Sequence, residues 1–284
     1  MRCIALAPVA FAACVLVSAT GQARAEDGVG PWVDGDEAEL RLVSAVSSVG
    51  AGEASVPLAL HMRLAEGWRI YWRTPGASGL PPQFDWTGST NLAAVTMRWP
   101  APIRFTFFGQ ESQGYRGEVL FPILARLVTP GAEASFRLTV QYLICREVCI
   151  PGEADLALDL ASGAARVTSA AADVARHASR IPAQAASHGV AIRALAGPGG
   201  LVVIATGREA FSAPDLFVEW PLSPGQRRPD LARPALTLAE QGKEAIFRLG
   251  VHPPLVRPGT RLTVTLVDGP AAVEAEVTVE QPPS

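Results

Sequence analysis

A two-residue alternation of apolar and polar side chains flanks a pair of cysteines and constrains the fold of this chain most strongly. Across residues 134–144 every second side chain is apolar, and the alternation returns across residues 154–160. Successive side chains of a β-strand point to opposite faces of the sheet, so each stretch predicts a strand with one buried face. Cys145 and Cys149 then lie in the connection between these two strands.

Short apolar runs separated by proline and glycine extend this pattern along the whole chain. The 284 residues include 24 Pro and 26 Gly, a texture typical of β-sandwiches. In the first part of the chain we expect strands over residues 38–47, 55–62, 69–72, 93–98, 118–128, 134–144 and 154–160. In the last part we expect strands over residues 190–196, 201–206, 216–220, 235–239, 245–249, 261–267 and 273–279.

An alanine-rich stretch over residues 162–181 separates the two sets of strands. Apolar side chains recur in it at helical spacing, namely Val167, Val174, Ala178 and Ile181. This pattern predicts a helix that Pro182 ends. We therefore expect an all-β protein of two immunoglobulin-like β-sandwich domains joined by a short helical linker. The expected boundaries are residues 26–161 for the first domain, 162–185 for the linker and 186–284 for the second domain.

The first 25 residues have the features of a secretory signal peptide. An arginine near the start is followed by an apolar run over residues 3–18 and by a small-x-small cleavage signal that ends at Ala25. We expect cleavage after Ala25 and export to the periplasm, a compartment in which disulfides form and persist. Cleavage removes Cys3 and Cys14 and leaves only the pair between the two strands.

The mature sequence is mildly acidic. Without the two arginines of the signal peptide, 22 Lys and Arg face 27 Asp and Glu, a net charge of about −5. Nucleic acid is therefore not an expected partner. Beyond the signal peptide, no stretch reaches the roughly 20 apolar residues that a membrane-spanning helix needs.

The spacing of the two cysteines limits how they can form a disulfide. On a straight strand, Cα atoms four residues apart lie about 13 Å from one another, beyond the roughly 7 Å that a disulfide spans. If Cys145 and Cys149 are bonded, the backbone between them must turn. Pro151 and Gly152 are suited to end that turn and to start the return strand.

A redox-active pair, a structural hairpin disulfide and a metal site are the three alternatives for these cysteines. In a chain-entropy treatment, closing a five-residue loop stabilises a fold by only about 2 kcal/mol, which a domain of this size does not need. The histidines that could complete a zinc site are scattered, at His61, His177, His188 and His252. A closed zinc site normally takes four ligands, so a Cu(I) dithiolate is the remaining metal alternative. We favour the redox-active pair and expect neither a metal nor another cofactor.

Four segments between residues 107 and 151 resemble a known family. They are Phe107-Phe108-Gly109, Tyr115-Arg116, a strand containing Pro122, and the cysteine pair followed by Ile150-Pro151. Together they resemble the periplasmic N-terminal domain of the DsbD family of thiol:disulfide interchange proteins. The likeness is closer to the related ScsB proteins, whose N-terminal region carries two β domains. It covers most of residues 30–160 and extends more loosely to the second domain.

The resemblance implies an immunoglobulin-like domain that acts as a component of a protein-disulfide reductase. Such a domain takes electrons from a membrane-embedded, electron-conducting DsbD- or ScsB-like protein. It delivers them to periplasmic thioredoxin-fold proteins by thiol-disulfide exchange. The family pattern implies that Cys149 attacks the partner disulfide and that Cys145 resolves the mixed disulfide.

The family also implies a short cap loop whose aromatic side chains shield the cysteines until a partner binds. The segment Phe107-Phe108-Gly109 matches that loop. Adjacent aromatic side chains cannot both face inward on one strand, so one phenylalanine needs another place, which the disulfide would supply. Tyr71 matches an aromatic-rich strand of the family and is expected near the cysteines, whereas Trp68 and Trp72 are expected in the sandwich core.

Two departures from the family limit what the resemblance implies. The family spacing between the cysteines is longer than the three residues that separate them here. The family also continues into a transmembrane conduit, whereas this sequence ends at Ser284, so we expect either that the conduit is a separate polypeptide or that the activity has changed. Two rival functions follow, a non-catalytic exported binding module with a structural disulfide, and a copper-handling protein like those associated with ScsB and copper tolerance.

Overall fold

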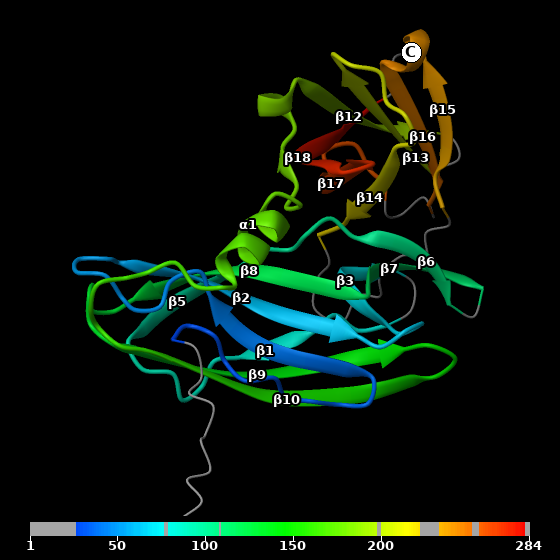
Figure 1. The fold of residues 1–284 in the computed structure, drawn as a ribbon. Helices are drawn as coiled ribbons and strands as arrows, with labels where there is room; N and C mark the ends of the chain where they lie inside the picture. The colour runs from blue at the N-terminus through cyan, green and yellow to red at the C-terminus, as the bar shows by residue number, and fades with distance from the viewer. Residues whose placement is uncertain are drawn as a thin grey trace, which may run out of the picture.

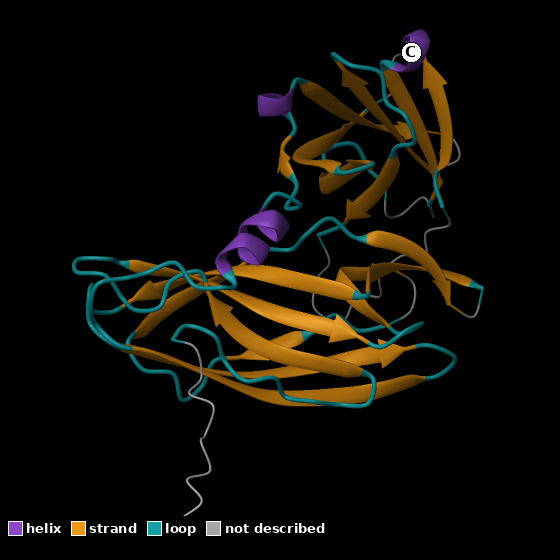
Figure 2. Cartoon of the chain, viewed as in Figure 1, coloured by secondary structure: helices purple, strands orange, loops and turns teal. Residues whose placement is uncertain are grey.

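The structure is a computed structural model, and it places two β domains with one short α-helix between them (Figures 1 and 2). The expected signal peptide lies outside the described residues, as do Phe108 and His252. The described residues are 27–76, 79–107, 109–197, 200–221, 233–251 and 256–281.

The first domain is a sandwich of two antiparallel sheets. One sheet has the strand order β1-β2-β8-β5, and the other has the order β10-β9-β3-β7-β6, with β4 paired to β9. The strands are β1 (Ala38–Ser44), β2 (Ser55–Leu64), β3 (Arg69–Gly76), β4 (Gln83–Asp85), β5 (Leu92–Met97), β6 (Ile103–Phe107), β7 (Gln110–Arg116), β8 (Glu118–Leu127), β9 (Ala134–Cys145) and β10 (Cys149–Leu160).

The core of this sandwich follows the predicted alternation. On β9, Phe136, Leu138 and Val140 are at most 1% exposed, and every second residue of β10 from Ala154 to Leu160 is also buried. These side chains pack against the inner face of the four-stranded sheet. Burying the side chains on one face of each strand stabilises the folded domain, because removing apolar surface from water contributes about 25 cal/mol per Å².

Strands β4, β6 and β7 were not expected from the sequence. Strand β7 reads Gln-Glu-Ser-Gln-Gly-Tyr-Arg, yet Ser112 and Gln113 are buried in it. Neighbouring strands, rather than intrinsic preference, place this segment in the sheet. Gly114 makes the pairing possible, because a Cβ there would lie 1.9 Å from the carbonyl oxygen of Ile70 on β3.

The linker helix is shorter than the sequence predicts. It spans α1 (Ala171–Ala178), and the segment before it runs in an extended path along the first domain. Val167, which was expected on the apolar side of the helix, is 81% exposed. The backbone carbonyl of Arg166 accepts from Ser47 N–H, and Thr168 N–H donates to Ala45 O, so these backbone groups are bonded to the domain and not within a helix.

Helix α1 covers part of the outer face of the four-stranded sheet. Ala170 and Val174 pack there against Val43, Ala59 and Leu120. After the helix come the short strand β11 (Ala183–Gln184) and one turn of 3₁₀-helix, η1 (Ala186–His188). The stretch that was expected to be a helical linker is therefore a mixture of extended chain, helix and turn.

In the second domain the strands lie at the predicted positions. The strand order is β14-β17-β18-β12-β13-β16-β15, with β11 paired to β18. These strands pack around an apolar core of their own. The strands are β12 (Val190–Gly197), β13 (Gly200–Gly207), β14 (Asp215–Glu219), β15 (Ala235–Ala239), β16 (Glu244–Gly250), β17 (Arg261–Asp268) and β18 (Ala271–Glu280), with a 3₁₀ turn, η2 (Glu240–Gly242), between β15 and β16.

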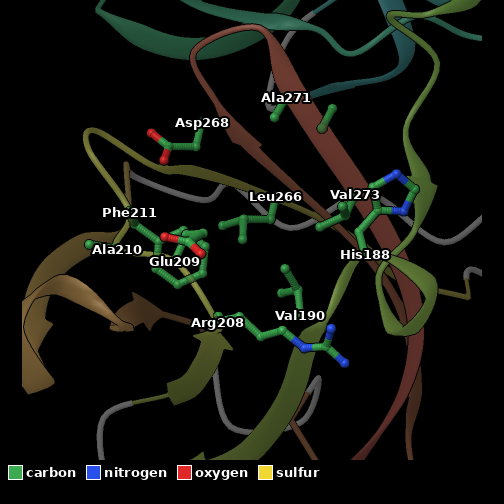
Figure 3. Close-up of a pocket in the computed structure, with 12 residues that line it drawn as sticks. His188, Val190, Arg208, Glu209, Ala210, Phe211, Leu266, Asp268, Ala271 and Val273 are labelled. Atoms are coloured by element: carbon green, nitrogen blue, oxygen red, sulfur yellow. The ribbon is translucent and has the colours of Figure 1, made fainter.

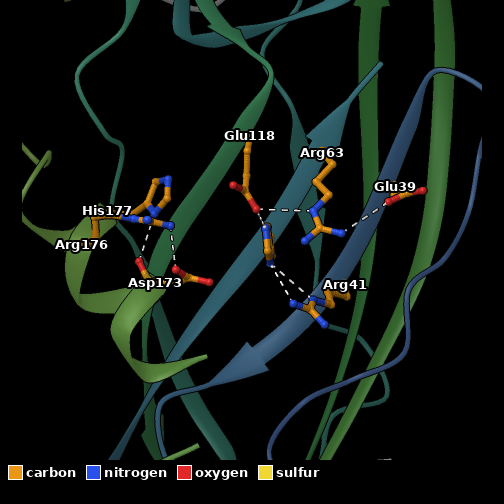
Figure 4. Close-up of polar contacts among 8 residues, drawn as sticks. Glu39, Arg41, Arg63, Glu118, Asp173, Arg176 and His177 are labelled. Carbon is orange, nitrogen blue, oxygen red and sulfur yellow. Dashed lines mark hydrogen bonds and ion pairs between the residues drawn. The ribbon is translucent and has the colours of Figure 1, made fainter. Parts of the chain in front are cut away.

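A buried histidine lies on the outer face of the four-stranded sheet, beside the helix. His61 is 1% exposed, and its Nε2 lies 2.6 Å from Oε1 of Glu118, while Nδ1 accepts from Arg41. Figure 4 shows Glu118, Arg63 and Arg41 grouped at this site. Burial lowers the pKa of His61, because it disfavours the imidazolium; Glu118 opposes this effect, and the two arginines add to it.

This histidine should make stability depend on pH. Because the pKa of His61 is lower in the folded state, the unfolded chain binds more protons below about pH 6.5. The stabilisation is therefore complete above that pH and is lost as the pH falls through the folded pKa. In urea titrations from pH 7 to 5.5, His61→Gln is expected to show a shallower decline in the free energy of unfolding than wild type. An unchanged slope would mean that His61 is not the group that titrates.

Candidate functional site

The two cysteines close a tight hairpin between β9 and β10. Cys145 ends β9 and Cys149 begins β10, directly opposite one another in the strand register. Their sulfur atoms are bonded at 1.99 Å, and their Cα atoms lie 4.1 Å apart. The backbone between them therefore turns, as the spacing required, within residues 146–148, where Arg146 N–H donates to the carbonyl of Val148.

Pro151 and Gly152 are not part of that turn, contrary to the expectation from sequence. Both are paired within β10, Pro151 opposite Leu143 and Gly152 opposite Tyr142. Strand β10 lies at the sheet edge, where a proline without an N–H is tolerated. A Cβ on Gly152 would lie 2.5 Å from the Tyr142 ring, so glycine allows that ring to lie across the edge strand.

The disulfide lies on the face of the sheet that points away from the sandwich core. Ile144 is turned inward and is 2% exposed, so its neighbour Cys145 points outward. On β3 the same relation holds, since Ile70 lies in the core and Tyr71 packs beside Cys145. The strand pattern thus brings an aromatic ring from one strand and a cysteine from the next to the same outer surface.

An aromatic cluster encloses one of the two sulfurs. Tyr71, Phe107 and Cys145 are buried together, with exposures of 1%, 9% and 1%, and Phe105, Leu143 and Cys149 pack against them. Cys149 is only half-buried, so it is the less shielded of the two cysteines. The site therefore has one buried cysteine and one that is partly exposed.

Tyr71 offers its hydroxyl group to both sulfurs. Its Oη lies 3.3 Å from Cys145 Sγ and 3.8 Å from Cys149 Sγ. When the disulfide is reduced, a hydroxyl in this position can donate to a thiolate and stabilise it. Gly79 covers the other side of the ring, where a Cβ would lie 2.3 Å from ring carbons. Glycine also suits the positive φ of +100° found there.

Two arginines border the hairpin. Arg69 pairs with Cys145 in the strand register. Its guanidinium lies 5.5 Å from the centre of the Phe105 ring. The guanidinium of Arg146 lies 5.2 Å from the centre of the Trp68 ring. Both guanidinium groups therefore pack on aromatic rings beside the hairpin.

The structure brings some of the expected cap residues to the cysteines. Phe107 and Tyr71 lie against the disulfide, and Gly109 is exposed at the tip of the β6–β7 hairpin with φ of +75°. Phe108 is outside the described residues. Trp72 is fully buried in the sandwich core, whereas Trp68 lies half-buried at its border.

Sequence reasoning missed three residues that shape the site. Phe105 lies two residues before Phe107, and Leu143 lies two residues before Cys145, so each shares a strand face with an expected site residue. The alternation of side chains could therefore have predicted both of them near the site. Gly79 carried no such signal, because its importance lies in its contact with a ring eight positions earlier in the chain.

Clefts occur beside the cysteines and elsewhere. One of about 330 Å³ runs along the hairpin and is lined by Leu80, Tyr142, Leu143 and Pro151 among others. Another, of about 300 Å³, lies in the second domain around Phe211 (Figure 3). Within the described ranges, no three His, Cys, Asp or Glu side chains are grouped so that they could hold a metal ion.

Two family models match separate parts of the chain. Residues 40–161 match the family described as thiol:disulfide interchange protein DsbD, N-terminal, and residues 180–282 match a domain family of unknown function. The resemblance of the first domain to the DsbD family is therefore confirmed. No curated protein sequence matches. In the part of the chain that the structure describes, no helix has the length and apolar character to cross a membrane.

Among solved structures, the crystal structure of the N-terminal periplasmic domain of ScsB from Proteus mirabilis has the same fold. The match has a TM-score of 0.72 and 21% identity, and it covers 90% of this chain and 99% of that one. The reduced form of the Neisseria meningitidis DsbD N-terminal domain matches with a TM-score of 0.26 and 15% identity, over 50% of this chain and 91% of that one.

Proposed function

We propose that this protein carries out thiol-disulfide exchange through Cys145 and Cys149, passing electrons to thioredoxin-fold proteins. The observation that carries the proposal is a disulfide with one cysteine buried under aromatic rings and the other partly exposed. A staple has no need of a tyrosine hydroxyl aimed at both sulfurs. The family match of the first domain supports the same chemistry.

The exchange follows from the arrangement of the sulfurs. In the reduced protein the Cys149 thiolate attacks a partner disulfide, and the displaced partner sulfur leaves as a thiolate. Cys145 then attacks Cys149, which closes the intramolecular disulfide and releases the second partner thiolate. Two electrons pass to the partner, and two thiol protons pass to the partner thiolates or to water. A dithiol donor reverses these steps and reduces this protein again.

The proposed setting is the periplasm. The amino-terminal sequence suits export with cleavage after Ala25, and the ScsB fragment with the same fold is a periplasmic domain. The electron donor in this scheme is a membrane-embedded DsbD- or ScsB-like protein, and the acceptors are periplasmic thioredoxin-fold proteins. Residues 26–161 form the redox domain, residues 162–185 the linker and residues 186–284 the second domain.

The reduction potential of the disulfide tests this proposal. We expect a value of about −180 to −270 mV, the range in which protein disulfide isomerase and thioredoxin exchange electrons. It can be measured by equilibrating the protein in glutathione or dithiothreitol buffers and counting alkylated thiols by mass. A value below about −300 mV, typical of structural disulfides in secreted proteins, would favour the binding-module alternative.

A further inference from the structure

The second domain packs against the strands that carry the candidate site. Phe217 of β14 is 1% exposed and belongs to the core of the first domain. Its ring lies 6.0 Å from that of Trp72 on β3, edge to face. The neighbour of Trp72 on the opposite face of β3 is Tyr71, which contacts the sulfurs. The two domains are therefore joined directly behind the disulfide.

Polar contacts fix β3 to the second domain. The Arg73 guanidinium donates to both carboxylate oxygens of Glu219, at 2.6 to 3.1 Å, and also pairs with Glu274. Thr74 Oγ1 donates to Glu219 at 2.7 Å. Arg73, Glu219 and Glu274 have side chains that are 20% to 26% exposed. Partial burial makes such paired, charge-assisted hydrogen bonds stronger than exposed ones.

A second contact fixes β6, the strand that carries the cap. Arg104 Nε lies 3.0 Å from Asp215 Oδ2, and Nη2 donates to Asp215 Oδ1 and to the carbonyl oxygen of Leu216. The guanidinium also lies 4.8 Å from the centre of the Phe217 ring. The Arg104 side chain is 7% exposed and that of Asp215 is 21% exposed, so this pair is partly shielded from water.

Strand alternation connects this contact to the cap. Arg104 points toward the second domain, whereas Phe105 and Phe107 point toward the cysteines. Strand β6 is the edge of its sheet, and among the described residues its one strand partner is β7. A cleft of about 300 Å³ separates part of β6 from the second domain, so β6 is not packed solidly from behind. The Arg104–Asp215 ion pair joins β6 to the second domain across this space.

We infer that the second domain holds the aromatic cap closed over the disulfide, with Arg104 and Asp215 as the positioning pair. The second domain would then regulate the proposed thiol-disulfide exchange. This inference rests on that proposed function. When the pair is intact, the β6–β7 hairpin keeps Phe107 against Cys145. When the pair is broken, β6 loses its ion pair with the second domain, and the sulfurs become accessible in a larger fraction of molecules.

The test is the rate at which dithiothreitol reduces the disulfide of the oxidised protein. Asp215→Asn removes the charge but keeps an oxygen that can accept from Leu216 N–H, a bond present in the wild type. We expect this variant to be reduced about tenfold faster, which corresponds to about 1.4 kcal/mol. Asp215→Glu restores the carboxylate and is expected to return the rate to within about twofold of wild type.

A matched control comes from an ion pair that lies away from the cap. Arg193 and Glu280 form an exposed ion pair within the second domain, so Glu280→Gln should leave the reduction rate unchanged. Equal rates for Asp215→Asn and wild type would overturn the inference, as would an increase in Glu280→Gln or a failure of Asp215→Glu to slow reduction. Dithiothreitol reduces the disulfide without a protein partner. The assay therefore tests the role of the second domain separately from exchange with thioredoxin-fold proteins, and either result can be negative while the other is positive.

Discussion

Replacing Cys145 by serine is expected to leave the protein covalently joined to a thioredoxin-fold partner, whereas replacing Cys149 is expected to leave it free. Cys149 is the more exposed of the two cysteines, and Cys145 is 1% exposed beneath Phe107 and Tyr71. In Cys145→Ser the first exchange step therefore proceeds, but the resolving thiol is absent. The mixed disulfide should accumulate in most of the molecules. Non-reducing electrophoresis and intact mass after mixing reduced variant with oxidised partner measure it.

The double variant Cys145→Ser/Cys149→Ser is the control for this experiment, and it should form no adduct. Loss of stability is not expected to confuse the result, because the five-residue disulfide loop contributes only about 2 kcal/mol. An adduct with Cys149→Ser and none with Cys145→Ser would reverse the assigned roles. The absence of an adduct with both single variants would contradict exchange with that partner.

Removing the Phe107 ring is expected to expose the buried sulfur. Phe107 packs against Cys145 and Tyr71 and is only 9% exposed. In Phe107→Ala, small thiols should reduce the disulfide at least about tenfold faster, because the ring no longer covers Cys145. The selectivity for a thioredoxin-fold partner over glutathione should fall in parallel. Both rates can be followed by quenching with acid and alkylating the free thiols.

Phe84→Ala is the matched control, since Phe84 packs against Trp99 in the sandwich core and not against the cysteines. This variant should lose stability without a faster reaction at the disulfide, provided that the reduction is measured well below the unfolding transition. If Phe84→Ala and Phe107→Ala accelerated reduction equally, general loosening of the domain would explain both. If neither did, Phe107 would not be a cap.

The sequence predicted the parts of the structure that depend on local pattern. The alternation along β9 and β10 identified the two strands, their buried parity and the cysteines at their junction. The same reasoning identified the strands of the second domain. These features are predictable because a period of two residues directly decides which face of a strand is buried.

Features that depend on contacts between distant segments could not be predicted. Strand β7 has few apolar residues and is placed by its pairing with β3 and β6. The expected linker helix lost its first half because residues before α1 bond to the first domain. Arg73 and Arg104 gave no sign that they bind carboxylates more than 100 positions later in the chain. Tertiary contacts decide each of these cases.

Transfer of electrons to a thioredoxin-fold protein tests the central claim most directly. Reduced protein is mixed with an oxidised thioredoxin-fold protein, the reaction is quenched with acid, and the thiols of both proteins are counted by mass. We expect one disulfide to form between Cys145 and Cys149 for each partner disulfide that is reduced, at a rate far above that with oxidised glutathione at the same concentration. If both thiols stay reduced while the partner stays oxidised, the pair does not act in thiol-disulfide exchange.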